Sequence, residues 1–182
     1  MNIIYYDQES RHYCFSTDDH TAYMPSTLIA FIDGACIRPA DDDEAFAGYG
    51  VYFGPGSVHN QSAHLSPNER HTNQRAELHA ALGALSTIRQ MRDFMSRELN
   101  HVVLVTDSAY VARSMSEYII QWRRNEYRTY HGDRIRNREL IQELDEELID
   151  FNEEGISVQF WQVPREWNQR ADRLAKDGAM MA

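Results

Sequence analysis

The sequence is poor in cysteine and has no long apolar run. Its two cysteines, Cys14 and Cys36, are not spaced like metal ligands, so we expect free thiols in a reducing compartment. No segment approaches the roughly 20 apolar residues that a membrane-spanning helix needs. The first residues, MNIIYYDQES, lack the basic start and apolar middle of a secretion signal. These absences predict an intracellular protein with no membrane partner, in the nucleus or the cytoplasm.

Positive charge is also scarce. The chain has 18 lysines and arginines against 28 acids, and its net charge of −10 argues against a generic nucleic-acid binder, which is usually basic. Arginines nevertheless gather in one segment, at Arg123, Arg124, Arg128, Arg134, Arg136 and Arg138. The sequence therefore carries a local basic segment on an acidic body.

The hydrophobic pattern predicts one α/β domain over residues 27–182. Short apolar or alternating runs predict strands over 28–33, 48–54, 58–65, 101–107 and 156–163. Three- and four-residue repeats of apolar side chains predict helices over 73–92, 108–120, 138–152 and 168–180. This order indicates a mixed five-stranded sheet flanked by helices, with three meandering strands followed by parallel ones. Residues 1–26 are polar and weakly patterned, so we interpret them as an N-terminal extension or a partly ordered arm.

Four acids are placed where such a fold would gather them. Asp33 and Asp107 each end a predicted buried strand. Glu77 and Asp172 each fall in the first turn of a predicted helix. Ligands of open α/β sheets bind outside the carboxyl ends of the strands, and clustered carboxylates suit Mg²⁺ or Mn²⁺. Two such ions can cleave a phosphodiester, although Glu77, Asp107 and Asp172, each taken singly, have the alternative role of a helix-dipole contact.

Five segments resemble the ribonuclease H family, most of all the catalytic domain of the eukaryotic type 1 enzymes. They are FIDGAC (31–36), AGYGVYFGPGS (47–57), RHTNQRAELHAAL (70–82), LVTDSAYV (104–111) and NQRADRLAKDGA (168–179). The resemblance implies the ribonuclease H-like fold and a two-metal-ion endonuclease with Mg²⁺ or Mn²⁺ as cofactor. Such an enzyme cuts the RNA strand of RNA–DNA hybrids and leaves 5′-phosphate and 3′-hydroxyl ends. The family's catalytic, metal-binding quartet falls on Asp33, Glu77, Asp107 and Asp172.

The resemblance also implies contacts to both strands of a hybrid. Asn73 and Gln74 match residues that reach the RNA 2′-hydroxyl, which can both donate and accept a hydrogen bond. Asn73 has the compatible alternative of a helix cap. Arg70, Thr72 and Asn137 match a pocket for a phosphate of the DNA strand, and their guanidinium, hydroxyl and amide groups suit that ligand.

Aromatic and basic side chains follow along the chain. Tyr110, Tyr118 and Trp122 have helical spacing and are similar to the family's aromatic DNA-binding channel, with a stripe of core residues as the alternative for Tyr110. Arg123 and Arg124 resemble the family's basic protrusion, where arginines bind phosphates without reading sequence. Without the resemblance, we would interpret the same arginines as the solvent-exposed face of a helix.

The sequence departs from the family at two places. The segment VPREWNQRAD (163–172) lacks the histidine that members commonly carry there, and Arg165 or Glu166 would take its space. The segment IRPADDDE (37–44) lacks an asparagine that often follows the first strand. Two alternatives therefore stay open: a non-catalytic, retroelement-derived nucleic-acid-binding module with this fold, and a nuclease of this fold that acts on DNA. We expect a monomer without a protein partner.

Overall fold

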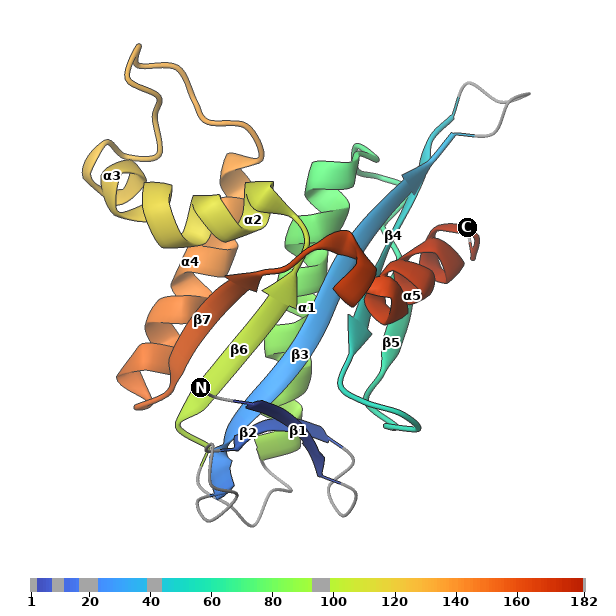
Figure 1. The fold of residues 1–182 in the computed structure, drawn as a ribbon. Coiled ribbons are helices and arrows are strands. Elements are labelled where there is room, and N and C mark those ends of the chain that lie inside the picture. Colours follow the sequence, from blue (N-terminus) through green and yellow to red (C-terminus); the bar gives the residue numbers. More distant parts are fainter. Residues whose placement is uncertain (1–2, 8–11, 17–22, 39–43, 93–98, 182) are drawn as a thin grey trace.

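The computed structural model describes residues 3–7, 12–16, 23–38, 44–92 and 99–181 (Figure 1). Its strands are β1 (Ile3–Asp7), β2 (His12–Ser16), β3 (Tyr23–Ile37), β4 (Phe46–Tyr52), β5 (Gln61–His64), β6 (His101–Thr106) and β7 (Ser157–Gln162). Its helices are α1 (Asn73–Arg92), α2 (Ala109–Arg113), α3 (Ile119–Arg124), α4 (Arg138–Glu153) and α5 (Gln169–Ala179). A π-helical turn, η1 (Ser114–Tyr118), joins α2 to α3, and a 3₁₀ turn, η2 (Arg165–Trp167), precedes α5.

The predicted mixed five-stranded sheet is confirmed, in the order β5-β4-β3-β6-β7. Strand β3 pairs with β4 in an antiparallel manner and with β6 in parallel, and β7 runs parallel to β6. Two further strands come from the first 26 residues, because β2 pairs with the first half of β3 and β1 pairs with β2. Strand β3 is longer than its apolar run, and β2 covers the backbone edge that β4 leaves free. The division at residue 26 stays a prediction.

Helices cover both faces of this sheet. In Figure 1, α1 and α4 lie behind the sheet and α5 lies in front of it. The main core fills the space under α1 and α4 and includes Leu28, Ile32 and Leu104, while Ile29 and Val103 form a smaller cluster on the opposite face. The inner strands are thus buried on both sides, which explains their unbroken apolar runs. Among the described helices, none is long and apolar enough to cross a membrane.

Two glycines let the acid-bearing helices approach the sheet. A Cβ added to Gly34 in β3 would lie 2.2 Å from the backbone nitrogen of Glu77 in α1. A Cβ added to Gly50 in β4 would lie 2.4 Å from the carbonyl oxygen of Ala171 in α5. Any larger residue at either position would push a helix away from the sheet. These close contacts fix the distance from the sheet at which the backbone segments that carry Glu77 and Asp172 lie.

Candidate active site

The central pair of acids is carried by neighbouring parallel strands, as predicted, with Asp33 inside β3 and Asp107 directly after the end of β6. Phe31 pairs with Val105, so Asp33 and Asp107, two residues further along each chain, lie side by side. The prediction that Asp33 ends its strand is wrong, because β3 continues to Ile37 along β4 after β6 has stopped. Strand β3 is therefore paired with a neighbouring strand on each edge, and Asp33 within it is 5% exposed.

The other two acids come from helices. Asp172 lies in the first turn of α5, as predicted. The prediction for Glu77 is wrong by one turn, because α1 begins at Asn73 and its first turn holds no acid. The hydroxyl of Thr72 accepts a hydrogen bond from a first-turn amide at 3.2 Å, so Thr72 has the capping role considered for Asn73. Asn73 is exposed and Gln74 half-buried.

The four acids share one electrostatic environment. Burial, then the charges of Asp107 and Asp172, raise the pKa of Asp33 to about 7. Burial, then the charges of Asp33 and Asp107, raise the pKa of Glu77 to about 9. The backbone amide of Gly34 donates to both carboxylates and opposes these shifts. Negative charge is therefore concentrated at one place and is only partly compensated.

Three residues around the acids make contacts that were not predicted from the sequence. The Asn168 amide nitrogen, in a residue 1% exposed, donates to Asp107 Oδ1 at 2.7 Å and to the carbonyl of Ile32 at 2.9 Å. Arg165 Nη2 lies 2.8 Å from Asp172 Oδ1, and Lys176 Nζ lies 2.6 Å from Asp172 Oδ2. The four-residue step from Asp172 to Lys176 is a sequence signal for a helical ion pair. The other two contacts depend on the loop before α5 and have no such signal.

The four carboxylates are donors that suit a hard divalent cation. Within the described ranges, no three Asp, Glu, His or Cys side chains form a ready metal-binding group. Both oxygens of Asp172 are bound to cationic side chains. Glu77 Oε2, however, is buried and has no hydrogen-bond partner among those residues. A cation among these carboxylates would supply that partner and the missing positive charge.

The proposed phosphate pocket joins two parts of the chain. Arg70 is exposed and Thr72 is half-buried, just before α1. Asn137 precedes α4 in a left-handed conformation, with φ of 52°, which asparagine tolerates better than most residues. Its amide nitrogen donates to the hydroxyl of Tyr110 at 3.2 Å. Asn137 is therefore held in one orientation beside a residue of the predicted aromatic channel.

A half-buried arginine, Arg75, connects the two parts. Arg75 donates from Nη2 to Glu69 Oε2 at 2.7 Å, and its Nη1 donates to Glu139 Oε1. Glu69 lies in the loop with Arg70, and Glu139 lies in the first turn of α4, two residues after Asn137. The Arg75 side chain is 13% exposed. This bridge keeps the loop and the start of α4 at a fixed separation.

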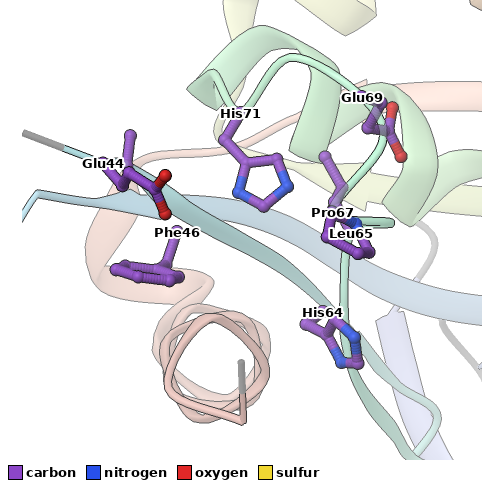
Figure 2. A pocket seen from close by; sticks show the side chains of 8 residues that line it. Glu44, Phe46, His64, Leu65, Pro67, Glu69 and His71 are labelled. Carbon is purple, nitrogen blue, oxygen red and sulfur yellow. The ribbon is translucent and has the colours of Figure 1, made fainter.

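His71 holds the same loop against the sheet. The amide of Ala47 donates to His71 Nδ1 at 3.1 Å, so Nε2 carries the proton and donates to the Ser66 carbonyl at 3.0 Å. Figure 2 shows the ring between Glu44 and Pro67, at the wall of a cavity of 440 Å³. None of the four candidate acids lines that cavity. The histidine is therefore a structural part of the loop and is separate from the carboxylate cluster.

The aromatic residues differ in exposure. Tyr110 is half-buried and packs against the main core, so both explanations offered for it have support. Tyr118 is 42% exposed, and its ring centroid lies 5.6 Å from that of Trp122. The π-helical turn η1 ends at Tyr118, and such turns are frequent at functional sites. Tyr118 is therefore the accessible residue of the predicted channel, whereas Trp122, like Tyr110, is half-buried against the main core.

The two arginines of the predicted protrusion have different surroundings. Arg123 donates to Asp145 from Nε at 2.7 Å and from Nη2 at 2.5 Å, and Asp145 is fully buried. The hydroxyl of Tyr127 donates to the same carboxylate at 2.7 Å, and this environment raises the pKa of Tyr127 to about 12, with burial as the main cause. Arg124 is exposed. The charge of Arg123 is thus compensated within the fold, whereas that of Arg124 faces solvent.

Comparisons with known proteins agree with the predicted family and fold. The chain matches the RNase H family model over residues 25–180. It is 32% identical to Ribonuclease H1 of Rattus norvegicus over 176 residues, which are 94% of this chain and 57% of that protein. It is 32% identical to Ribonuclease H of Nitrobacter hamburgensis over 173 residues, 90% of this chain and 97% of that protein. The structure of LC11-RNase H1 in complex with RNA/DNA hybrid has the same fold, with a TM-score of 0.55, 21% identity and coverage of 84% of this chain and 96% of that one. The chain spans about half the length of its mammalian relatives.

Proposed function

Because the chain belongs to the ribonuclease H family, we propose that it is an endonuclease that hydrolyses the RNA strand of RNA–DNA hybrids. The products would carry 5′-phosphate and 3′-hydroxyl ends, and the chain would act as a monomer. The observation that carries this proposal is the electrostatic coupling of four acids from separate elements, with the pKa values of Asp33 and Glu77 raised. A relative of the same fold has been solved with an RNA/DNA hybrid.

The carboxylates have the metal-binding role in this proposal. Asp33, Glu77, Asp107 and Asp172 would hold Mg²⁺, or Mn²⁺ in its place. Two such ions, when bound, would activate a water molecule and stabilise the leaving oxygen of the phosphodiester. The chain's own contribution is orientation, because Asn168 fixes one oxygen of Asp107 and the glycine contact at Gly34 fixes the backbone of Glu77.

The substrate contacts divide between the two strands. Asn73 and Gln74, at the start of α1, would bind 2′-hydroxyls of the RNA strand. The Arg70–Thr72–Asn137 pocket would bind a phosphate of the DNA strand, with Arg75 holding its two sides together. Tyr110, Tyr118 and Trp122 would contact the DNA strand in the aromatic channel, and Arg123 and Arg124 would add charge at its edge. Arg124 is the more available of the two arginines.

The deciding experiment compares substrates and metal. Purified protein is incubated with end-labelled RNA–DNA hybrid, single-stranded RNA and duplex DNA of one sequence, with Mg²⁺ and with a chelator. We expect cleavage of the RNA in the hybrid only, and only with Mg²⁺. Binding of hybrid without cleavage would support the non-catalytic module instead, and cleavage of duplex DNA would support the DNA nuclease.

A further inference from the structure

The carboxylate of Asp172 is bound by two cationic side chains. Arg165 contacts one oxygen and Lys176 contacts the other, at 2.8 and 2.6 Å. Lys176 lies four residues along the same helix, so its pair is a feature of α5 itself. Arg165 instead comes from the turn η2, seven residues before Asp172. Its contact depends on how that turn is folded.

The turn presents Arg165 to the acids through backbone contacts. The amide of Trp167 donates to the Pro164 carbonyl at 2.9 Å, and the amide of Asn168 donates to the Arg165 carbonyl at 3.0 Å. Asn168 is in turn anchored on β3 through the Ile32 carbonyl. The backbone of Arg165 is therefore fixed to the site, while its side chain is 70% exposed. An exposed guanidinium can leave its partner at small cost, because surface ion pairs are weak.

The charge of Arg165 acts beyond Asp172. It interacts electrostatically with Asp107 and Asp33, and it lowers the pKa of Glu77 against the effect of burial. All four acids of the proposed metal site are thus within its field. A divalent cation that uses an oxygen of Asp172 would meet a positive charge already bound to that oxygen.

We propose that Arg165 is a displaceable cation that occupies Asp172 in the metal-free protein and competes with the divalent ion for it. The inference rests on the metal-binding role proposed above for the four acids. Arg165 is a positioning residue in this scheme, since it sets the metal concentration at which the site fills. Lys176 stays on the other oxygen and keeps the carboxylate oriented while Arg165 leaves.

The test measures metal binding without nucleic acid. Isothermal titration calorimetry with MgCl₂, repeated with MnCl₂, compares the wild-type chain with Arg165→Gln and with Arg173→Gln. Arg173 is the matched control, because it is exposed, loses the same charge and follows Asp172 directly, where side chains of a helix do not face each other. Arg165→Gln removes a positive charge that contacts the carboxylate, so we expect this variant to bind Mg²⁺ about three- to tenfold more tightly than the wild type. Arg173→Gln should stay within about twofold of wild type, because its charge is screened by solvent.

A third variant separates charge from geometry. Arg165→Lys keeps the charge without the guanidinium fork, so its affinity should fall between wild type and Arg165→Gln. Equal or weaker Mg²⁺ binding by Arg165→Gln would overturn the proposal, as would an equal gain in Arg173→Gln or binding by none of the proteins. The titration contains no substrate, so it tests the role of Arg165 in metal binding independently of hybrid cleavage. The cleavage assay in turn tests the proposed nuclease activity independently of the Arg165 variants.

Discussion

The carboxylate cluster and the basic segment are built in different ways. The cluster lies where backbones meet: β3 pairs on both edges, and α1 and α5 touch the sheet at glycines. The basic segment, from the end of α3 to the start of α4, is mostly exposed, and a few side-chain contacts such as Arg123 to Asp145 connect it to α4. The first region is therefore positioned by packing, whereas the second is positioned by individual polar contacts. Changes in the carboxylate cluster should therefore reduce cleavage without reducing hybrid binding. Changes in the basic segment should first reduce hybrid binding.

The largest expected effect follows from removing one carboxylate. Asp107→Asn keeps the side-chain volume but removes a negative oxygen, and a metal contributes several kcal/mol to the transition state, so hybrid cleavage should fall at least about a thousandfold. Hybrid affinity should change only a few-fold, because the basic segment is intact. Single-turnover cleavage and a filter-binding assay measure the two quantities.

Asp177→Asn on the exposed side of α5 is the matched control and should cut normally. An Asp107→Asn protein that cuts at the wild-type rate would place the chemistry elsewhere. One that loses cleavage and binding together would abolish the separation between the two regions.

The second prediction tests whether Arg123 belongs to the fold or to the substrate surface. Arg123→Gln leaves the buried Asp145 with Tyr127 as its remaining donor, so the free energy of unfolding should fall by about 2–3 kcal/mol. The value is below that for a fully buried pair, because Arg123 is 43% exposed. Arg124→Gln, its exposed neighbour, should change stability by less than about 0.5 kcal/mol. Urea denaturation of both variants decides the matter, and equal stabilities would mean that the Asp145 contact is not structural.

The third prediction concerns the metal-free carboxylate cluster. The pKa values of about 7 for Asp33 and about 9 for Glu77 lie above their ordinary range, so the folded state binds protons that the unfolded state releases. This stabilisation is complete at acid pH and is lost as pH rises through those values. The contribution of these two groups to stability without metal should therefore fall by several kcal/mol between about pH 4, where the unfolded acids lose their protons, and about pH 9.

Glu77→Gln removes one of the two titrating groups and should flatten that fall, measured by urea denaturation across the pH range in chelator. Glu153→Gln, an exposed residue of α4, should leave it unchanged. Saturating Mg²⁺ should also flatten the wild-type profile. If stability in chelator did not change with pH, the raised pKa values of Asp33 and Glu77 would be contradicted.

The sequence predicted the main elements that carry the four acids for a physical reason. Buried strands and amphipathic helices leave strong periodic signals, so the bounds of α1 and the pairing of β3 with β6 could be expected from the chain alone. The one-turn error at Glu77 arose because this acid is the fifth residue of α1 and therefore lies beyond its first turn. The segments of β1 and β2, IIYYD and HYCFS, are rich in β-branched and aromatic residues. These strands were nevertheless missed, because their pairing depends on a free edge of β3 that the sequence pattern does not reveal.

Side-chain contacts between distant segments were not predictable in the same way. Nothing in the spacing of Arg123 and Asp145 distinguishes a buried tie from a phosphate contact. The same holds for Arg165, whose partner follows from the fold of η2. Residues 39–43, where a family asparagine is missing, lie outside the described part of the chain. The side chain of Cys14 does too, whereas Cys36 is a free thiol as expected.

The smallest expected effect belongs to Arg124, and it examines the basic segment directly. Arg124→Ala should weaken hybrid binding only a few-fold at moderate salt and reduce the slope of log affinity against log salt by about one, because one phosphate contact and its released counterion are lost. Arg170→Ala, an exposed arginine of α5, is the control for net charge and should leave the slope closer to that of wild type. Binding isotherms at several salt concentrations in chelator, which prevents cleavage, provide the slopes. If both variants lower the slope equally, hybrid attraction is spread over the whole surface. The basic segment would then have no separate role in binding, and the contrast with the carboxylate cluster would concern the fold alone.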